Sequence, residues 1–155
     1  MTGQVKVNDR VWRGVLKRVS EMKRGTVRVG VMGDAGDENG VSLAEIAAFH
    51  EFGTSTIPER SFLRSTFYGH AAEGLRMMCE KLSKAIVEGK LDEPRALGLL
   101  GTWAVAEVKK TIVNRQTTGP EDQALAAATI AAKGSSLPLV DTGQLINSIT
   151  YVVEK

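Results

Sequence analysis

The sequence has few of the residues that mark metal centres and disulfide-linked domains. Its 155 residues include one cysteine and two histidines. One cysteine cannot form a disulfide within the chain, and these three side chains are too few for a convincing zinc site. Cys79 stands in an apolar helical stretch, so we expect a buried small hydrophobic residue rather than a nucleophile. This cysteine usage favours folding in a reducing cytoplasm.

Long apolar runs are also missing. No run approaches the ~20 residues that a membrane helix needs, and the first residues lack the apolar core of a secretory signal. We therefore expect no membrane partner. Hydrophobic residues make up 43% and charged residues 25%, which is a globular rather than a disordered composition. The length predicts a single domain over residues 1–155 with a core that needs no metal or disulfide.

A strong charge of one sign is absent as well. The net charge is +2, whereas a dedicated DNA-binding domain usually carries a larger, clustered basic excess. Five basic residues do fall close together: Lys17, Arg18, Lys23, Arg24 and Arg28. We interpret them as the solvated face of a helix and the turn after it. A surface for nucleic acid or for an acidic partner is the alternative.

Hydrophobic periodicity predicts both helices and strands. Apolar residues recur at helical spacing in four segments, of which the third forms one long helix: 8–24, 42–53, 61–88 and 92–112. Ser42 and Asp92 are placed to cap two of these helices. Alternation over 26–32 and 148–153 predicts two strands, which must pair with each other. We therefore expect an α+β fold in which a small antiparallel sheet packs against several helices, including one long helix.

The stretch 114–140 gives weaker signals. Residues 114–120 are polar and end in Gly-Pro, and residues 123–132 are rich in alanine without a clear apolar face. We expect a mobile segment here. Asp141 is then placed to cap one helical turn that aims Leu145 at the core.

Two apparent metal motifs fail on spacing. His50 and Glu51 begin an HExxH pattern, but threonine stands at position 54, where a second histidine is needed. The loop 34–45 has acids at its first and twelfth positions, as a calcium loop has. It carries Asn39 where that loop needs glycine. We expect no bound metal.

Two apparent catalytic motifs fail for similar reasons. The glycines that follow the first strand have GxxGxxG spacing, and no lysine follows them as in a phosphate-binding loop. Asp141-Thr142-Gly143 resembles the aspartic protease triplet, but no second such triplet exists to share a proton. A helix cap and a tight turn explain it better. We therefore expect no enzyme and no cofactor.

Two segments together give a more specific signal. Residues 42–67 read SLAEIAAFHEFGTSTIPERSFLRSTF, and residues 133–153 read KGSSLPLVDTGQLINSITYVV. Both resemble the tail-completion or neck proteins of long-tailed bacteriophages, a virion-morphogenesis group that includes minor tail protein Z-like chains. In that group a helix ends in HEFGT, a short link leads to IPxRxFLR, and the chain closes with PLxDTGxLxxSI. The strand over 26–32 is similar to the group's VxVGI strand. Ser61 departs from the pattern, because many relatives have a second proline there.

The resemblance implies structural tasks for its residues. Gly53 permits a left-handed helix end, and the phenylalanines with Leu63 are expected to anchor the short helix on the long one. Arg60 and Arg64 flank this apolar group and are placed to bind carboxylates across an interface. The full set of fold-anchor or interface candidates is Phe49, Phe52, Gly53, Pro58, Arg60, Phe62, Leu63, Arg64, Asp141, Thr142, Gly143 and Leu145.

The resemblance also implies a function without catalysis. Members of the group look like ring-forming proteins, commonly hexamers, of the virion neck. They stand between head-closure and adaptor proteins on one side and tail terminator or tail tube proteins on the other. Double-stranded DNA passes through the lumen, and any contact with it would be independent of sequence. A tail terminator or head-closure protein is the first alternative, because it shares size and ring habit. A small nucleic-acid-binding protein is the second, and it rests on the basic cluster.

Overall fold

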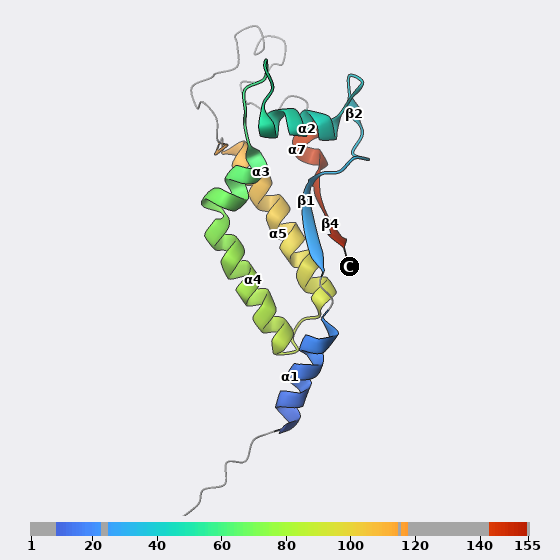
Figure 1. The fold of residues 1–155 in the computed structure, drawn as a ribbon, viewed down its shortest axis with the longest axis vertical. Helices are drawn as coiled ribbons and strands as arrows, with labels where there is room; N and C mark the ends of the chain where they lie inside the picture. The colour runs from blue at the N-terminus through green and yellow to red at the C-terminus, as the bar shows by residue number, and fades with distance from the viewer. Residues whose placement is uncertain (1–8, 23–24, 115, 118–142, 155) are drawn as a thin grey trace, which may run out of the picture.

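The computed structural model describes residues 9–22, 25–114, 116–117 and 143–154. In chain order its elements are α1 (Asp9–Glu21), β1 (Thr26–Val31), β2 (Asp37–Glu38), β3 (Val41–Ser42), α2 (Leu43–Phe52), α3 (Phe62–Arg64), the π-helical turn η1 (Ser65–His70), α4 (Ala72–Val87), α5 (Glu93–Val113), α7 (Gln144–Ser148) and β4 (Ile149–Glu154). Helices and a small antiparallel sheet pack together (Figure 1), which confirms the α+β fold. The long helix is α5, with 21 residues.

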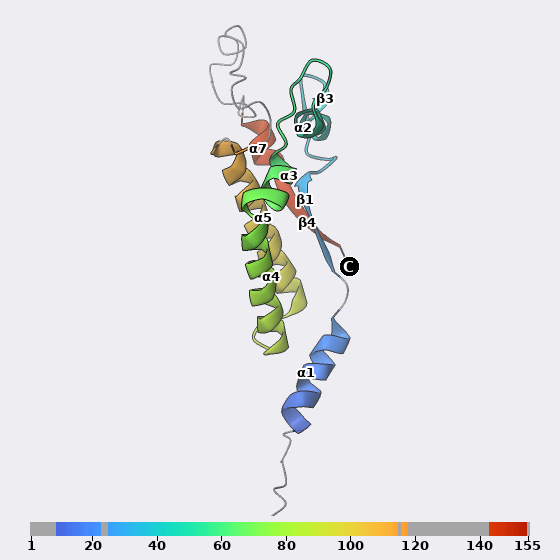
Figure 2. The same cartoon turned by 60° about the vertical axis from the view of Figure 1, so that its left-hand side comes forward.

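The first and last described strands form the main sheet. β1 and β4 are antiparallel, with Thr26 opposite Glu154 and Val31 opposite Ile149. Because side chains alternate along a strand, the valines of β1 share one face with Ile149, Tyr151 and Val153 of β4, whereas Val152 lies on the other face. Helix α5 contacts both strands, and α4 packs along α5 (Figure 2).

The sheet approaches α5 closely at two glycines. A Cβ atom at Gly101 would lie 2.2 Å from Cδ2 of Tyr151, and one at Gly98 would lie 3.7 Å from the Tyr151 hydroxyl. Glycine weakens a helix interior by about 1 kcal/mol relative to alanine. At Gly101 that cost is offset by the space left for the Tyr151 ring.

Buried side chains form two clusters. The larger lies where α2, α3, α5, α7 and β4 meet, and consists of Ala47, Phe62, Val108, Ile112, Leu145 and Ile149. The smaller lies between α4 and α5, and consists of Leu82, Ile86 and Ala96. The larger cluster therefore joins segments from both halves of the sequence.

The helix expected over residues 61–88 is not continuous. Its first part is α3 and the turn η1, and Gly69 then leaves helical geometry with φ −111° and ψ −121° before α4 begins. Two hydroxyls compete with the helical pattern: Ser65 donates to the Ser61 carbonyl, and Thr66 donates to the Phe62 carbonyl at 2.6 Å. Such back-bonding bends helices, and glycine tolerates the break.

Two further expectations are corrected by the structure. Cys79 is exposed: its spacing of three from Leu82 and seven from Ile86 places it at the edge of the buried side of α4 rather than at its centre. The expected loop after β1 contains a short hairpin of β2 and β3. Asn39 and Gly40 both have positive φ there, as a two-residue hairpin turn requires.

Some expectations fall where the structure gives no description. The proposed mobile segment 114–140 lies outside the described residues except for 114 and 116–117, and Asp141 and Thr142 also lie outside them.

Helix α1 extends from one end of the molecule (Figures 1 and 2). None of its residues is buried. It is attached to the body through Arg18, whose Nε and Nη2 donate hydrogen bonds of 3.0 and 2.7 Å to the carbonyl of Val87 at the end of α4. Among the described helices, none is both long and apolar enough to cross a lipid bilayer.

Candidate functional site

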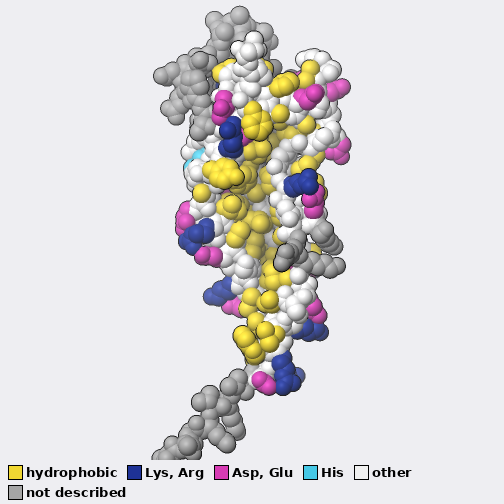
Figure 3. All heavy atoms as spheres, viewed as in Figure 1, with side chains coloured by type: hydrophobic (Ala, Val, Ile, Leu, Met, Phe, Trp, Pro, Cys, Tyr) yellow, Lys and Arg dark blue, Asp and Glu magenta, His cyan; other side chains and the backbone are white. Residues whose placement is uncertain are grey.

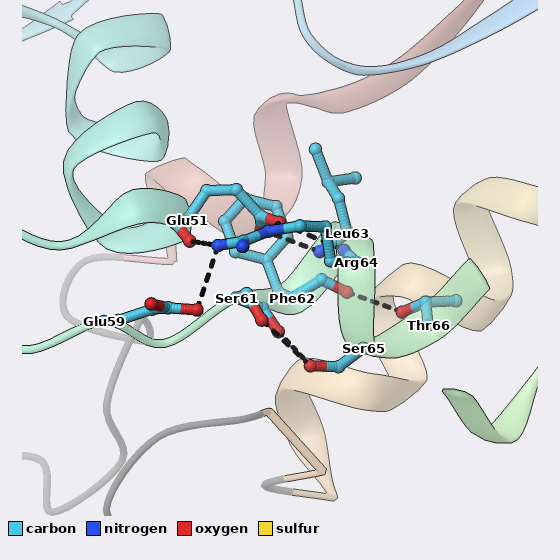
Figure 4. A network of polar contacts seen from close by, with 8 residues as sticks. All are labelled: Glu51, Glu59, Ser61, Phe62, Leu63, Arg64, Ser65 and Thr66. Carbon is cyan, nitrogen blue, oxygen red and sulfur yellow. Dashed lines mark hydrogen bonds and ion pairs between the residues drawn. The ribbon is translucent and has the colours of Figure 1, made fainter. Parts of the chain in front are cut away.

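A buried carboxylate joins α2 to α3. Glu51 has 4% of its surface exposed. Its Oε2 accepts a 2.9 Å hydrogen bond from the backbone N–H of Leu63, and its Oε1 accepts one of 3.0 Å from the N–H of Arg64 (Figure 4). The first N–H groups of a helix have no partner inside the helix and carry partial positive charge. Glu51 supplies that partner from a different helix.

The guanidinium of Arg64 completes this contact. Its Nε lies 3.1 Å from Oε1 of Glu51, and its Nη2 binds the Glu51 carbonyl and, at 2.9 Å, Oε1 of Glu59. Its Cζ also lies 5.1 Å from the centre of the Phe52 ring, a cation–π distance. We call Glu51, Phe52, Glu59 and Arg64 the clasp. Arg64 therefore binds two carboxylates of its own chain, and its binding of carboxylates across an interface stays a prediction.

The link between the two halves of the clasp has a fixed backbone. Gly53 ends α2 with φ +71°, and a Cβ atom there would lie 3.0 Å from the backbone nitrogen of Glu59. Thr54 then bonds to Ile57 twice: its N–H donates to the Ile57 carbonyl at 2.8 Å, and its Oγ1 accepts from the Ile57 N–H at 2.9 Å. Pro58, which is half-buried, follows directly.

The link closes on α2 through the backbone of Arg60. Its N–H donates a 2.7 Å hydrogen bond to the carbonyl of His50, and the residue is half-buried. The sequence HEFGTSTIPERSFLR thus folds as one closed turn between α2 and α3.

The first resembling segment meets the second in the larger cluster. Phe62 has 0% of its surface exposed, Leu145 has 6% and Ile149 has 2%. Gly143, with φ +75°, stands directly before α7 and turns the chain so that Leu145 enters the cluster. The two segments that carry the resemblance therefore pack against each other.

The predicted apolar anchors divide into two groups. Phe62 is in the core, and Leu63 is half-buried against it. For Phe49 and Phe52 the anchoring expectation is wrong, because these side chains are 40% and 68% exposed. Helix α2 buries its other side, at Leu43, Ala47 and Glu51.

Sequence reasoning missed the role of Glu51. In the sequence it stands out only as half of an incomplete HExxH pattern. Its spacing of four from Ala47 and eight from Leu43 places it on the buried side of α2. A charged residue at such a position requires a partner, and this signal could have revealed the clasp.

A second polar connection, also missed, fixes η1 on α5. The hydroxyls of Thr66 and Thr111, both fully buried, lie 2.6 Å apart. Nε2 of His70 lies 2.7 Å from the Thr111 hydroxyl, which also donates to the carbonyl of Glu107 at 3.0 Å. These contacts hold the interrupted helix in position.

Shifted pKa values belong to exposed ion pairs on the helices. A hydrogen bond from Arg76 lowers the pKa of Glu73, and the same contact with Glu80 nearby raises the pKa of Arg76. A hydrogen bond from Lys90 lowers the pKa of Glu88. Surface pairs of this kind favour the charged forms and provide no proton donor or acceptor for catalysis near neutral pH.

A cavity of about 580 Å³ lies between the end of α1, the α4–α5 turn and the start of α5. Its lining includes Met22, Leu91 and Leu97 together with Arg18. Because the Arg18 guanidinium is bound to the Val87 carbonyl, we interpret the cavity as a packing gap where α1 joins the body.

The carboxylate at the centre of the clasp already has hydrogen-bond partners within the protein. Both oxygens of Glu51 accept hydrogen bonds, so this carboxylate is engaged in structure rather than available as a base. In the part of the chain that the structure describes, no group of three or more His, Cys, Asp or Glu side chains is placed to hold a metal ion. The arrangement is suited to fixing the shape of the protein.

In comparison with known proteins, no protein family, no curated protein and no solved structure matches this chain.

Proposed function

We propose that this protein is a structural component of the neck of a long-tailed bacteriophage particle. Copies of it form a ring, a hexamer by the resemblance, that joins the tail to the head and surrounds the DNA channel. The observation that carries the proposal is the meeting of the two resembling segments. Phe62 from the first packs with Leu145 and Ile149 from the second in one buried cluster.

The way the charged motif residues are used supports a structural role. Glu51 and Arg64 bind each other and the backbone around them, which fixes the angle between α2 and α3. Several large apolar side chains remain outside, and an exposed apolar face on a protein commonly marks a contact with another protein. A protein that works by shape needs both a rigid body and free faces.

In the proposed ring, the two sides of the protein bind different partners. Head-closure and adaptor proteins bind on one side, and tail terminator or tail tube proteins bind on the other. Copies within the ring meet through two different patches, because a closed ring requires a heterologous contact. DNA in the lumen meets only lysine and arginine side chains, without base recognition.

Deleting the coding sequence from the phage genome that carries it tests this function. Electron microscopy of the lysate is expected to show full heads and complete tails that are not joined, and supplying the protein from a plasmid is expected to restore joined particles. Tails of irregular length would instead indicate a tail terminator, and heads that have lost their DNA a head-closure protein. Normal infectious particles without the protein would overturn the proposal.

A further inference from the structure

Charge is separated along the first 59 residues. Residues 1–28 contain eight basic and two acidic residues, a net charge of +6, and residues 29–59 contain six acidic residues and no lysine or arginine, a net charge of −6. The structure places α1, which has four basic and two acidic residues and so a net charge of +2, at one end of the long axis. It places α2, β2 and β3, from the acidic segment, at the other end (Figure 1).

The basic end presents an apolar stripe. Along α1 the exposed fractions are 62% for Val11, 57% for Trp12, 50% for Leu16 and 49% for Val19, and Met22, directly after the helix, is 39% exposed. These residues recur at helical spacing, so they form one face of the helix. In the space-filling view, apolar side chains follow the front of the molecule down to this end (Figure 3). A face of this kind on a projecting helix is suited to packing against another protein.

The acidic end presents a smaller apolar face. On α2, Glu45, Phe49 and Phe52 are exposed at spacings of four and three, so they share the outer side of the helix. Val41, just before α2, is 38% exposed. The Arg64 guanidinium binds Glu51 and Glu59, so the acids that can meet a basic partner at this end are Asp34, Asp37 and Glu45.

We propose that the α1 stripe of one copy packs on the outer face of α2 in the next copy, head to tail. The occupant of each face is thus a second copy of this chain. Apolar residues meet at the centre of the contact, and the basic residues of α1 face the acids around α2. This inference specifies the contact between copies in the proposed ring and rests on that part of the proposed function.

Two features favour this pairing over others. Within one copy, α1 and α2 lie at opposite ends of the molecule in both ribbon views (Figures 1 and 2), so they cannot contact each other. A symmetric contact of α1 with α1, or of α2 with α2, would bring like charges together and is opposed by their repulsion. The opposite charges of the two ends favour a heterologous contact.

Two complementary variants of the full chain test the contact. Trp12→Gln with Leu16→Gln removes the α1 stripe and leaves α2 intact, and Glu45→Lys with Phe52→Gln changes the α2 face and leaves α1 intact. By light scattering after size-exclusion chromatography, the wild type is expected to form oligomers and each variant to be monomeric. An equimolar mixture of the two variants is expected to give a one-to-one dimer, since one intact contact remains.

Controls separate contact from folding. Met77, on α4, is 58% exposed and belongs to neither face, so Met77→Gln is expected to keep the wild-type oligomer. Circular dichroism melting is expected to show all variants folded. Added salt is expected to weaken the wild-type oligomer, because charge pairs at the rim are screened.

Each other outcome has a definite meaning. A monomeric wild type, or a mixture of the variants that stays monomeric, overturns the head-to-tail contact. A monomeric wild type whose α1 binds vesicles of anionic phospholipid would mark α1 as a membrane-surface helix. If both variants keep the wild-type oligomer, this contact fails while a neck ring built on another surface stands. If the contact holds but the deletion phage makes joined particles, only the neck function fails.

Discussion

Glu51 shows how one side chain converts a sequence into a rigid turn. Its carboxylate caps the N–H groups of Leu63 and Arg64 from a different helix. The Arg64 side chain then supplies the positive charge that a buried carboxylate needs. Because three donors converge on one group, its loss affects all of them together.

Glu51→Gln is expected to lower the free energy of unfolding by about 2–3 kcal/mol. An amide keeps one acceptor oxygen, but it places an NH₂ group against backbone donors and leaves Arg64 without its buried partner. Urea denaturation measures the change. Glu45→Gln, on the exposed side of the same helix, is the control and is expected to stay within about 0.5 kcal/mol of the wild type. Equal stability of both variants would contradict the role of the clasp.

Phe62→Ala is expected to cost about 3–5 kcal/mol, because the side chain is fully buried in the larger cluster. Phe52→Ala, which removes an exposed ring under Arg64, is expected to cost about 1 kcal/mol or less. Thermal unfolding of the two variants under one set of conditions gives the comparison. A melting shift near zero for Phe62→Ala would place that residue outside the core of the monomer.

At the scale of single residues, sequence reasoning succeeds where burial follows from periodicity. Leu145 and Phe62 are both buried, and both belong to segments that the resemblance marked. It fails for Phe49 and Phe52, because an aromatic residue on a short helix can face either way and only the packing of α2 decides. It also misses Thr111, whose partners are distant in sequence.

The elements themselves follow closely from local chemistry. Ser42 and Asp92 accept hydrogen bonds from Ala44 and Arg95, as expected for helix caps, and the two predicted strands pair with each other. The break at Gly69 is different. Apolar spacing continues through it, so periodicity predicts one helix, and only the contacts of η1 with α5 reveal the interruption.

Alanine at two glycines of α5 is expected to have opposite effects. Gly101→Ala is expected to destabilise the fold by about 1–3 kcal/mol, because the new Cβ would meet the ring of Tyr151 at 2.2 Å. Gly98→Ala places its Cβ at an ordinary contact distance of 3.7 Å and is expected to stabilise the helix by up to about 1 kcal/mol. Chemical denaturation of the two variants shows whether each substitution raises or lowers the free energy of unfolding. Stabilisation by both substitutions would show that the strand can move away from α5.

At the scale of the whole molecule, the net charge does not reveal how the charged residues are distributed. The basic first segment (+6) and the acidic second one (−6) cancel, and the total of +2 comes from residues 60–155. The fold then places α1, from the first segment, and α2, β2 and β3, from the second, at opposite ends of an elongated body (Figure 1). Composition alone could not give this separation, because it depends on where α1 and α2 lie in space.

Binding to double-stranded DNA is expected to be weak and independent of sequence. The basic residues of α1 provide contacts to phosphate but no constellation for reading bases. Fluorescence anisotropy with two unrelated duplexes is expected to give equal affinities that fall together as salt is raised. A strong preference for one duplex would favour a nucleic-acid-binding protein over a neck component.

The pairing of β1 with β4 has a consequence for synthesis in the cell. The two strands are separated by more than a hundred residues, so β1 leaves the ribosome long before its partner exists. Until β4 emerges, the hydrogen-bonding edge of β1 is open to strands of other nascent chains. The sheet closes only when residues 149–154 have been translated, so a message truncated before that point yields a chain that cannot complete its fold and is prone to aggregate.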